Sequence, residues 1–328
     1  MPVGMREISK ATGVSITTVS NVLHKKGRVS ASTRKRILAA AKELGYFQKQ
    51  RSLVSGQLGV IYYAPPQERG GSYYTAEAIS AIQEVVSKQN YQLNFHIIDG
   101  LNAQAPPMVE EGNIERLLVI GGSISDRLVE KLVCQKLPLV LLYTEHPTLD
   151  LNCVLADNQK GAYWASRHLL ELGHRKIGFV NGWSRTHTSA AKLAGYRQAL
   201  SEGGLAFEPS LCAEGDFTTE GGASQIAKLL ERNPALSAVF VGDDIMALGA
   251  MRQAQAMGKR IPADLAIIGF GESPFSAHSQ PPLSTVCVPK RLIGALGAQR
   301  LLALLQSDSE PLKILAPTKL IIRESSGG

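Results

Sequence analysis

Residues 5–23 read MREISKATGVSITTVSNVL, a stretch that predicts two short helices joined by a turn at Gly13. Glycine tolerates the positive φ that ends a helix, and the hydroxyl of Ser15 can accept a hydrogen bond from the first N–H groups of the second helix. Apolar residues at helical spacing predict a core shared by the two helices. These residues are Ile8, Ala11, Val14, Val19, Val22 and Leu23. The residues left facing outward are Ser15, Ile16, Thr17, Ser20 and Asn21.

A third amphipathic segment follows, with Ser30 and Ser32 as candidate N-caps and Gly45 beyond its end. Three helices within about 45 residues are the minimal unit of a helix-turn-helix DNA-binding domain. The residues expected on the apolar face of the third helix are Ile37, Leu38, Ala41 and Leu44.

Positive charge is concentrated in the same part of the chain. Residues 1–56 carry eleven lysines and arginines and two glutamates, a formal charge of +9, whereas the whole chain carries +7. A basic segment on a nearly neutral body is typical of a protein that binds a polyanion, because each neutralised phosphate releases condensed counterions. A solvated helix surface could explain any single charge, but the cluster beside a helix-turn-helix favours DNA binding.

The rest of the chain predicts an α/β body of two lobes. Short apolar strands alternate with helices, as in parallel doubly wound sheets, and the pattern occurs twice. Ligands of such sheets bind beyond the carboxyl ends of the strands, so we expect a ligand-binding cleft between the lobes. We predict strands at 58–64, 92–98, 116–120, 137–143, 176–180, 238–241 and 265–270, and helices at 76–89, 126–135, 160–172, 190–203, 221–231 and 245–257.

The composition argues against a membrane or secreted protein. The N-terminus is polar and basic, and no apolar stretch approaches the roughly 20 residues that a membrane helix needs. We therefore expect a cytoplasmic protein with no membrane partner. The four cysteines, Cys134, Cys153, Cys212 and Cys287, are widely spaced, which favours buried thiols over disulfides or a zinc site. No metal and no cofactor is expected.

The sequence resembles the LacI/GalR family of bacterial transcription regulators over nearly its whole length. The resemblance rests on GVSITTVSNVL at 13–23, followed by matches at 28–30, 33–34 and 44–46. In the body it rests on LGHRKI at 172–177, DIMALGA at 244–250, IPADL at 261–265, PLSTV at 282–286 and PTKL at 317–320, with shorter matches at 157–158, 161–162, 168–169, 195–196 and 215–217.

The resemblance implies a homodimer that places its second helices in successive major grooves of a pseudo-palindromic double-stranded DNA operator. Ile16, Thr17 and Asn21 would then face base edges, which specify the sequence. Asn21 departs from the arginine common in the family, and asparagine suits adenine where arginine suits guanine. The residues implied to hold phosphates are Ser15, Ser20, His24, Ser30 and Thr33.

The hinge also departs from the family pattern. Tyr46 is followed by FQKQRSL at 47–53, without the usual proline and about two residues shorter than in the family. Leu53 is the candidate wedge for the minor groove, and the alternative is a plain linker leucine. By resemblance, the chain divides into a headpiece at 1–46, a hinge at 47–57 and a periplasmic-binding-protein-like effector-binding and dimerisation domain at 58–328. Its N-lobe would comprise 58–156 with 289–314, and its C-lobe 157–287 with 317–325.

Family members bind a small molecule, commonly a sugar or a related metabolite, between the lobes, and this shifts a two-state equilibrium coupled to DNA affinity. In this chain Lys192 stands where many members have arginine, and lysine lacks the bidentate fork. Asp243 replaces a frequent asparagine, and Gly271 replaces an aspartate. The positive charge of Arg185, in the loop before the helix that carries Lys192, adds one more candidate contact to those implied by the resemblance. The contacts that the resemblance implies are Tyr74, Tyr143, Lys192, Phe217, Asp243, Gly271 and Glu272.

Two ligand classes remain open on these residues. Arg185 and His187 near Lys192 favour an anionic effector such as a sugar acid or sugar phosphate, because charge-assisted hydrogen bonds favour that pairing. Asp243 and Glu272 favour a neutral polyol. Phe217 could contact the apolar face of a sugar ring or serve as lobe core.

Two other classes of protein compete with a carbohydrate-responsive repressor. A solute-binding protein of a sugar transporter would share the two lobes, but the basic headpiece and the lack of an export signal argue against it. An enzyme is not expected, because no Walker loop, metal-ligand pair or nucleophile elbow is present and His174 at a helix-to-strand turn favours a structural role. The end of the sequence, at 323–328, follows the last strand without a leucine heptad extension, so we expect a dimer rather than a coiled-coil tetramer.

Overall fold

The computed structural model describes residues 5–23, 29–44, 56–63, 73–98, 105–110, 114–122, 124–304 and 310–327. It divides into two compact units, one of Met1–Gln57 with Ser87–Gln92 and the other of Leu58–Val86 with Leu93–Gly328. In the described part of the chain, none of the helices has the length and apolar character needed to traverse a lipid bilayer.

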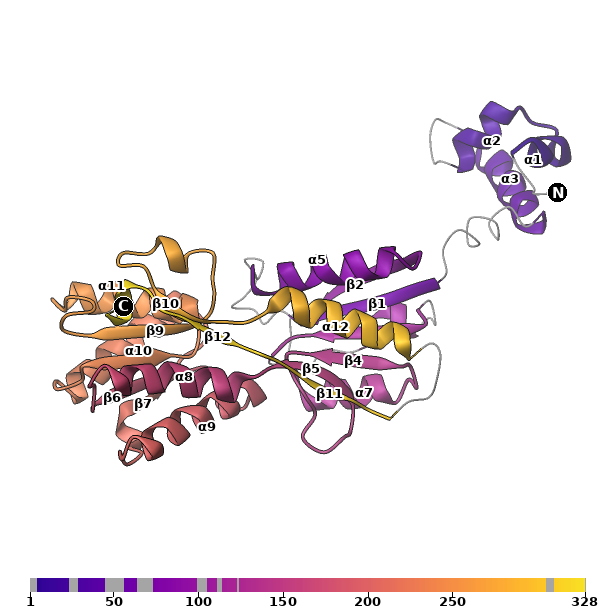
Figure 1. Ribbon diagram of the computed structural model, residues 1–328. Helices are drawn as coiled ribbons and strands as arrows, with labels where there is room; N and C mark the ends of the chain where they lie inside the picture. The colour runs from indigo at the N-terminus through magenta and orange to yellow at the C-terminus, as the bar shows by residue number, and fades with distance from the viewer. Residues whose placement is uncertain are drawn as a thin grey trace. The chain divides into compact units, whose positions relative to one another are not determined.

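The first unit contains three helices, α1 (Met5–Thr12), α2 (Ile16–Leu23) and α3 (Ala31–Glu43) (Figure 1). Gly13 has φ +68°, the left-handed conformation that closes α1. The buried core of the three helices consists of Ile8, Val19, Val22, Ile37 and Ala41. Five of the ten apolar positions predicted from the sequence therefore form this core, and Val14, Leu23 and Leu44 pack against it partly buried.

Two expected core residues are exposed instead. Ala11 lies on the surface of α1, and the buried position is taken by Thr12, whose hydroxyl donates to the carbonyl of Ile8 at 2.6 Å. Leu38 is 39% exposed, because Ile37 and Ala41 fill the inner face of α3. A threonine that bonds its own helix backbone can be buried without an unsatisfied hydroxyl.

The second unit contains two six-stranded sheets. Sheet A has the order β11-β5-β4-β3-β1-β2, and the pairings of β1–β3, β3–β4, β4–β5 and β5–β11 are parallel. Its apolar core lies between the sheet and its helices and includes Val119, Leu128 and Leu141. The strands are β1 (Gly56–Tyr63), β2 (Tyr91–Ile98), β3 (Arg116–Ile120), β4 (Leu139–Leu142), β5 (Asn152–Ala156) and β11 (Lys313–Ala316); the helices are α5 (Tyr73–Ser87), α6 (Pro107–Glu110), α7 (Asp126–Val133) and α12 (Lys290–Ala303).

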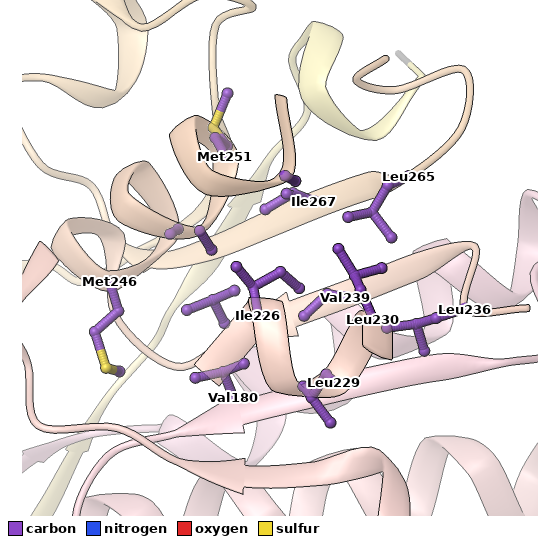
Figure 2. Close-up of a cluster of buried hydrophobic side chains, with 14 of the residues drawn as sticks. Val180, Ile226, Leu229, Leu230, Leu236, Val239, Met246, Met251, Leu265 and Ile267 are labelled. Atoms are coloured by element: carbon purple, nitrogen blue, oxygen red, sulfur yellow. The ribbon is translucent and has the colours of Figure 1, made fainter. Parts of the chain in front are cut away.

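Sheet B has the order β12-β10-β9-β8-β6-β7, in which only the β10–β12 pairing is antiparallel among the described strands. Figure 2 shows its core, to which two helices contribute Ile226 and Met251 and the sheet contributes Val239. The strands are β6 (Ile177–Asn181), β7 (Cys212–Glu214), β8 (Ala238–Val241), β9 (Ala266–Gly271), β10 (Ser284–Cys287) and β12 (Lys319–Ile321); the α-helices are α8 (Asn158–Glu171), α9 (His187–Glu202), α10 (Thr219–Arg232) and α11 (Asp244–Ala256), and the 3₁₀ helices are η2 (Pro209–Leu211), η3 (Ser276–His278) and η4 (Glu324–Ser326).

The chain passes between the two sheets three times. It leaves sheet A after β5, returns after β10 through α12, which packs on β3, β4 and β5, and leaves again between β11 and β12. Parallel strands place their following loops at one edge of the sheet, where ligands of doubly wound folds bind. A ligand-binding site is therefore expected in the loops after β3 and β4 of sheet A and after β6, β7 and β9 of sheet B.

The helices of sheet B pack closely at glycines, of which Gly195 and Gly222 are examples. A Cβ built on Gly195 of α9 would lie 2.0 Å from the carbonyl oxygen of Gln159 in α8, and one on Gly222 of α10 would lie 2.0 Å from that of Met246 in α11. Both positions therefore require glycine.

Of the four cysteines, Cys153 alone is fully buried and Cys134 is exposed, so the expectation of four buried thiols is wrong for Cys134.

Candidate DNA-binding surface and effector site

The start of α2 presents three residues to solvent. Ser15 accepts a hydrogen bond from the N–H of Thr18 at 3.1 Å, which confirms it as the N-cap, and it is exposed together with Ile16 and Thr17. Ile16 is 45% exposed although it is a large apolar residue. Asn21 lies about one turn later and is half-buried. This surface combines polar and apolar groups that can contact base edges and thymine methyl groups.

The expected phosphate contacts fall in two places. Ser20 on α2 is half-buried, and Ser30 before α3 is exposed and accepts from the N–H of Thr33 at 3.2 Å. Both Ser15 and Ser30 thus serve as caps. His24 and Leu53 lie outside the described residues.

Three residues with positive φ stand just beyond strands of the two sheets. They are Tyr143 after β4 (φ +67°), Phe217 after β7 (φ +65°) and Glu272 after β9 (φ +54°). This conformation is strained for residues other than glycine, and such strain concentrates at functional sites. All three were implied as effector contacts by the resemblance.

Phe217 belongs to an aromatic cluster that the sequence pattern did not reveal. Its ring meets the ring of Trp183 edge-on, with centroids 5.2 Å apart, and the guanidinium of Arg185 lies 4.4 Å from the centroid of the Trp183 ring. Gly182 lets Phe217 approach, because a Cβ at that position would be 2.1 Å from Cζ of the ring. Phe217 and Arg185 are thus brought together through Trp183, at the carboxyl ends of β6 and β7.

Lys192 is buried rather than directed outward. Its Nζ donates to the carbonyl of Gly242 at 2.7 Å and lies 4.3 Å from the centroid of the Phe270 ring. Burial lowers the pKa of Lys192 to about 8, although the carboxylates of Asp243 and Asp244 raise it. The Nζ atom of Lys192 is thus held by the protein itself.

Asp243 has a structural role at the start of α11. Its Oδ1 accepts from the N–H groups of Ile245 at 2.8 Å and Met246 at 3.2 Å, so it is an N-cap. Burial, followed by the neighbouring Asp244, raises the pKa of Asp243 to about 6, whereas Lys192 and the capping N–H groups lower it. Capping leaves the second carboxylate oxygen, Oδ2, available for other contacts.

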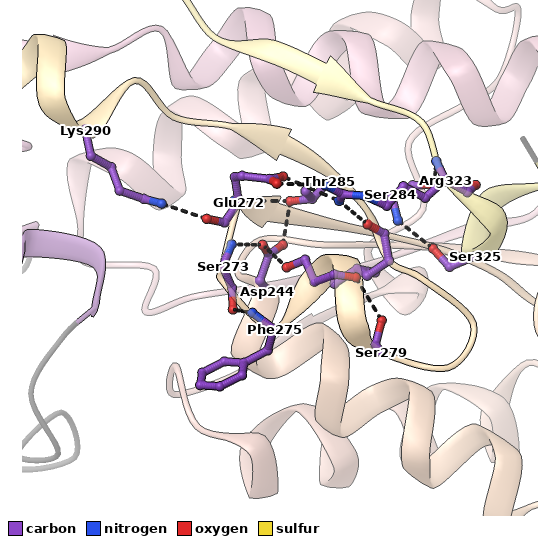
Figure 3. Close-up of polar contacts among 12 residues, drawn as sticks. Asp244, Glu272, Ser273, Phe275, Ser279, Ser284, Thr285, Lys290, Arg323 and Ser325 are labelled. Carbon is purple, nitrogen blue, oxygen red and sulfur yellow. Dashed lines mark hydrogen bonds and ion pairs between the residues drawn. The ribbon is translucent and has the colours of Figure 1, made fainter. Parts of the chain in front are cut away.

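Asp244 was not expected from the sequence, yet it is the centre of a buried hydrogen-bond network (Figure 3). It accepts from the N–H of Ser273 at 2.6 Å and from the hydroxyls of Ser276 at 2.7 Å and Thr285 at 2.5 Å. Burial raises its pKa, and these donors lower it. The network fixes the segment after β9 against α11 and β10.

Glu272 lies in that segment and is bound by two cationic side chains. Its carboxylate pairs with Arg323, with Oε1 2.7 Å from Nη2, while its backbone carbonyl accepts from Nζ of Lys290 at 2.7 Å (Figure 3). Lys290 begins α12, which packs on sheet A, and is also 3.5 Å from Glu77 of α5. The contact thus joins the segment after β9 to the sheet A side of the unit.

A second contact between the two sides involves His187, the first residue of α9. Its Nδ1 lies 2.9 Å from Oε1 of Glu145 in the loop after β4, and Glu145 also pairs with Lys313 of β11. Burial raises the pKa of Tyr143, which directly follows β4. Of the other candidate effector residues, Tyr74 lies in α5, and Gly271 is the last residue of β9 and has φ +130°.

The headpiece has two short helices joined by a glycine turn, and the start of the second helix is exposed. The body consists of two doubly wound sheets. Together these features define a helix-turn-helix regulator with a ligand-binding body. A family profile described as "Bacterial regulatory proteins, lacI family" matches residues 4–48, and one described as "Periplasmic binding protein-like domain" matches residues 166–326. The chain belongs to the LacI family and is a DNA-binding transcriptional regulator.

Individual relatives agree along the whole chain. The HTH-type transcriptional repressor PurR of Aliivibrio salmonicida is 32% identical over 304 residues and is covered to 91%, as is this chain. The solved complex of the transcriptional regulator CelR with cellobiose has a TM-score of 0.75 at 26% identity, with 98% of this chain and 99% of that chain covered. The lac repressor dimer bound to operator and the anti-inducer ONPF shares the fold, with a TM-score of 0.74 at 24% identity and 99% of each chain covered.

Proposed function

We propose that the chain represses carbohydrate-related catabolic genes and is controlled by a small sugar, sugar acid or sugar phosphate bound at the carboxyl ends of the strands. The observation that carries this proposal is the set of strained residues Tyr143, Phe217 and Glu272, which stand beyond strands of both sheets. The solved CelR relative was bound to cellobiose, which supports a carbohydrate. Effector contacts would come from these residues together with Tyr74, Arg185, Lys192 and Asp243.

At the headpiece, Ile16, Thr17 and Asn21 would read base edges while Ser15, Ser20, Ser30 and Thr33 would contact phosphates. The exposed Ile16 supports this assignment, because an apolar residue at the start of a recognition helix gains by contacting a thymine methyl group. His24 would add a phosphate contact and Leu53 a minor-groove wedge. The target would be a pseudo-palindromic operator with half-sites about one helical turn apart.

The protein would bind this operator as a homodimer. The lac repressor relative was solved as a dimer on its operator. In this chain β2 is at the end of sheet A, and its alternate residues Phe95 and Ile97 are 43% and 58% exposed. An exposed apolar edge strand is a typical surface for self-association. In a sedimentation measurement, wild-type protein should behave as a dimer and the variant Ile97→Asp as a monomer.

Selection of binding sites from randomised duplex DNA tests the DNA-binding part of the proposal. Wild-type protein should enrich a pseudo-palindrome, with an affinity that falls steeply with salt. The double variant Thr17→Ala/Asn21→Ala should lose the enriched sequence, whereas Lys228→Gln, which removes an exposed charge from α10, should keep it. Absence of salt-dependent DNA retention would instead favour a solute-binding protein.

A thermal-shift screen of sugars, sugar acids and sugar phosphates tests the effector part. A ligand of the folded state raises the melting temperature by mass action. The same ligand should change operator affinity in a separate titration, and Phe217→Ala should remove both effects. If a sugar shifts the melting temperature of wild-type protein and of Phe217→Ala equally, the proposed effector site is wrong.

A further inference from the structure

The loop between β6 and α9 is held in one conformation by hydrogen bonds to Asn181, Glu214 and Trp183. The N–H of Gly182 donates to Oδ1 of Asn181 at 2.9 Å, and the N–H of Ser184 donates to Oε2 of Glu214 at 3.0 Å. The hydroxyl and the N–H of Thr186 both donate to the carbonyl of Trp183, at 3.0 and 3.1 Å. Trp183 is therefore positioned before any ligand arrives, which lowers the entropic cost of binding.

Trp183, Phe217 and Arg185 together form a surface that we call the aromatic wall. Trp183 and Phe217 are half-buried and Arg185 is exposed. The edge-on packing of the two rings and the guanidinium over the indole are contacts that restrict all three side chains. Phe217 holds this position in spite of its positive φ, so the surrounding structure must determine it.

The donors of the aromatic wall are unused in the described part of the chain. There the guanidinium of Arg185 has no hydrogen bond or ion pair, and the indole N–H of Trp183 has no acceptor. Lys192 differs, because its Nζ is engaged by Gly242 and the Phe270 ring. Within the described residues, Arg185 can therefore bind an anionic group without breaking a hydrogen bond inside the protein, whereas Nζ of Lys192 already donates to Gly242.

The carboxylates nearest in sequence are already engaged. Glu214 accepts from Ser184, and Asp216 accepts from the N–H of Thr218 at 3.0 Å and from its hydroxyl at 2.6 Å. Neither makes an ion pair with Arg185. A planar guanidinium with free donors matches the two oxygens of a carboxylate or phosphate.

We propose that the aromatic wall binds a sugar carrying an anionic group, with the apolar ring face against Phe217 and Trp183 and the carboxylate or phosphate on Arg185. The inference rests on the proposed function and specifies its ligand class. A neutral sugar would leave the guanidinium without a partner and would bind more weakly. Arg185 and Trp183 would then determine specificity.

Fluorescence gives a direct test, because the chain has only two tryptophans, Trp164 and Trp183. Trp164 lies on α8, is 43% exposed and packs on Tyr163 at 5.0 Å. The variant Trp164→Phe therefore reports on the aromatic wall, and Trp183→Phe is its matched control. Full-length protein would be titrated with glucose, gluconate, glucuronate, galacturonate and glucose 6-phosphate.

At least one acid or phosphate should change the emission of Trp164→Phe and leave that of Trp183→Phe unchanged. Calorimetry should show that Arg185→Gln weakens this ligand by about tenfold or more, while Arg185→Lys retains part of the affinity, as expected for a charge-assisted hydrogen bond. Glucose should bind at least about tenfold more weakly than the preferred acid or phosphate. The ratio of sugar acid to sugar phosphate affinity identifies the anionic group.

The proposal is overturned if glucose binds as tightly as every anionic probe, if Arg185→Gln keeps wild-type affinity, or if no anionic probe binds. Operator binding measured on the same preparations separates this failure from that of the proposed function. Neutral sugars that release operator DNA without any effect of Arg185→Gln would contradict the ligand class alone. If wild-type protein does not bind operator DNA, the regulatory function itself is contradicted.

Discussion

Nδ1 of His187 lies 2.9 Å from Oε1 of Glu145, and this contact joins the first residue of α9 to the loop that follows β4 of sheet A. His187 directly follows the loop that carries Trp183 and Arg185. A ligand that shifts this loop would therefore also change the contact with Glu145. Any control of DNA affinity requires that the ligand bind one arrangement of the two sheets more tightly than another.

The burial of His187 should make stability depend on pH. Burial, followed by the charge of Lys313, lowers the pKa of His187 below its ordinary 6.5, although Glu145 opposes the shift. Between the lowered pKa and 6.5 the unfolded chain binds more protons than the folded one, so this stabilising contribution is complete above 6.5 and is lost as the pH falls. Urea denaturation at pH 7.5 and 5.5 should show a smaller loss for His187→Gln than for wild type.

The pKa values of His168 and His174 are also lowered by burial, and both residues remain in the His187→Gln variant. Their contribution cancels in the comparison with wild type. Equal loss of stability in the two proteins would show that His187 is not the titrating group.

Gly182 should be required for effector binding. Alanine would place Cβ 2.1 Å from Cζ of Phe217, so the ring must move from Trp183. Overpacking of this kind costs about 1–3 kcal/mol of folding stability. Effector affinity measured by calorimetry should fall, while operator binding without effector should persist because the headpiece is unchanged.

Gly122→Ala provides the matched control for this prediction. Its Cβ would be 3.8 Å from the nearest atom, in Thr188, which is ordinary van der Waals contact. The control should therefore bind effector nearly as wild type does. Equal affinities of Gly182→Ala and wild type would exclude Phe217 from the effector site.

Asp244→Ala should strongly destabilise the second unit. It removes the acceptor of Ser273, Ser276 and Thr285 from a fully buried position. Loss of a buried, multiply bonded carboxylate costs about 3–5 kcal/mol. Denaturation midpoints should show this loss, while the exposed Asp150→Asn should change stability by less than about 0.5 kcal/mol.

The sequence predicts the elements whose apolar periodicity is local and clear, but the prediction misses α12 and the strands β5, β7, β10, β11 and β12. Strands of three to five residues are too short to show a period. Among the predicted helices the main error is at the start, where side-chain caps begin the helix before its apolar pattern does. Thr186 caps α9 at His187, three residues before the predicted start at 190, and Thr218 caps α10 at Thr219, two residues before 221. The cap at Ser15 is predicted correctly because it stands two residues after the glycine of the turn.

The candidate site was harder to predict because its contacts join loops that are distant in sequence. The Trp183 ring meets Phe217 across 34 positions, and no periodic pattern signals such a contact. The adjacent Gly182 could have suggested that another group approaches closely. The hydrogen bond of Lys192 to the carbonyl of Gly242 could not be predicted either, because that carbonyl becomes a neighbour only when β8 pairs beside β6.

Asn21 should set the base preference at one position of each operator half-site. It lies on α2 about one turn beyond the exposed Thr17, and its amide is suited to adenine N6 and N7. Asn21→Arg should shift that position toward guanine, whose O6 and N7 accept from a guanidinium. Ser20→Ala is the control, since loss of a phosphate contact lowers affinity for all sequences alike. If selection from randomised DNA yields the same sequence for Asn21→Arg and wild type, Asn21 does not contact a base.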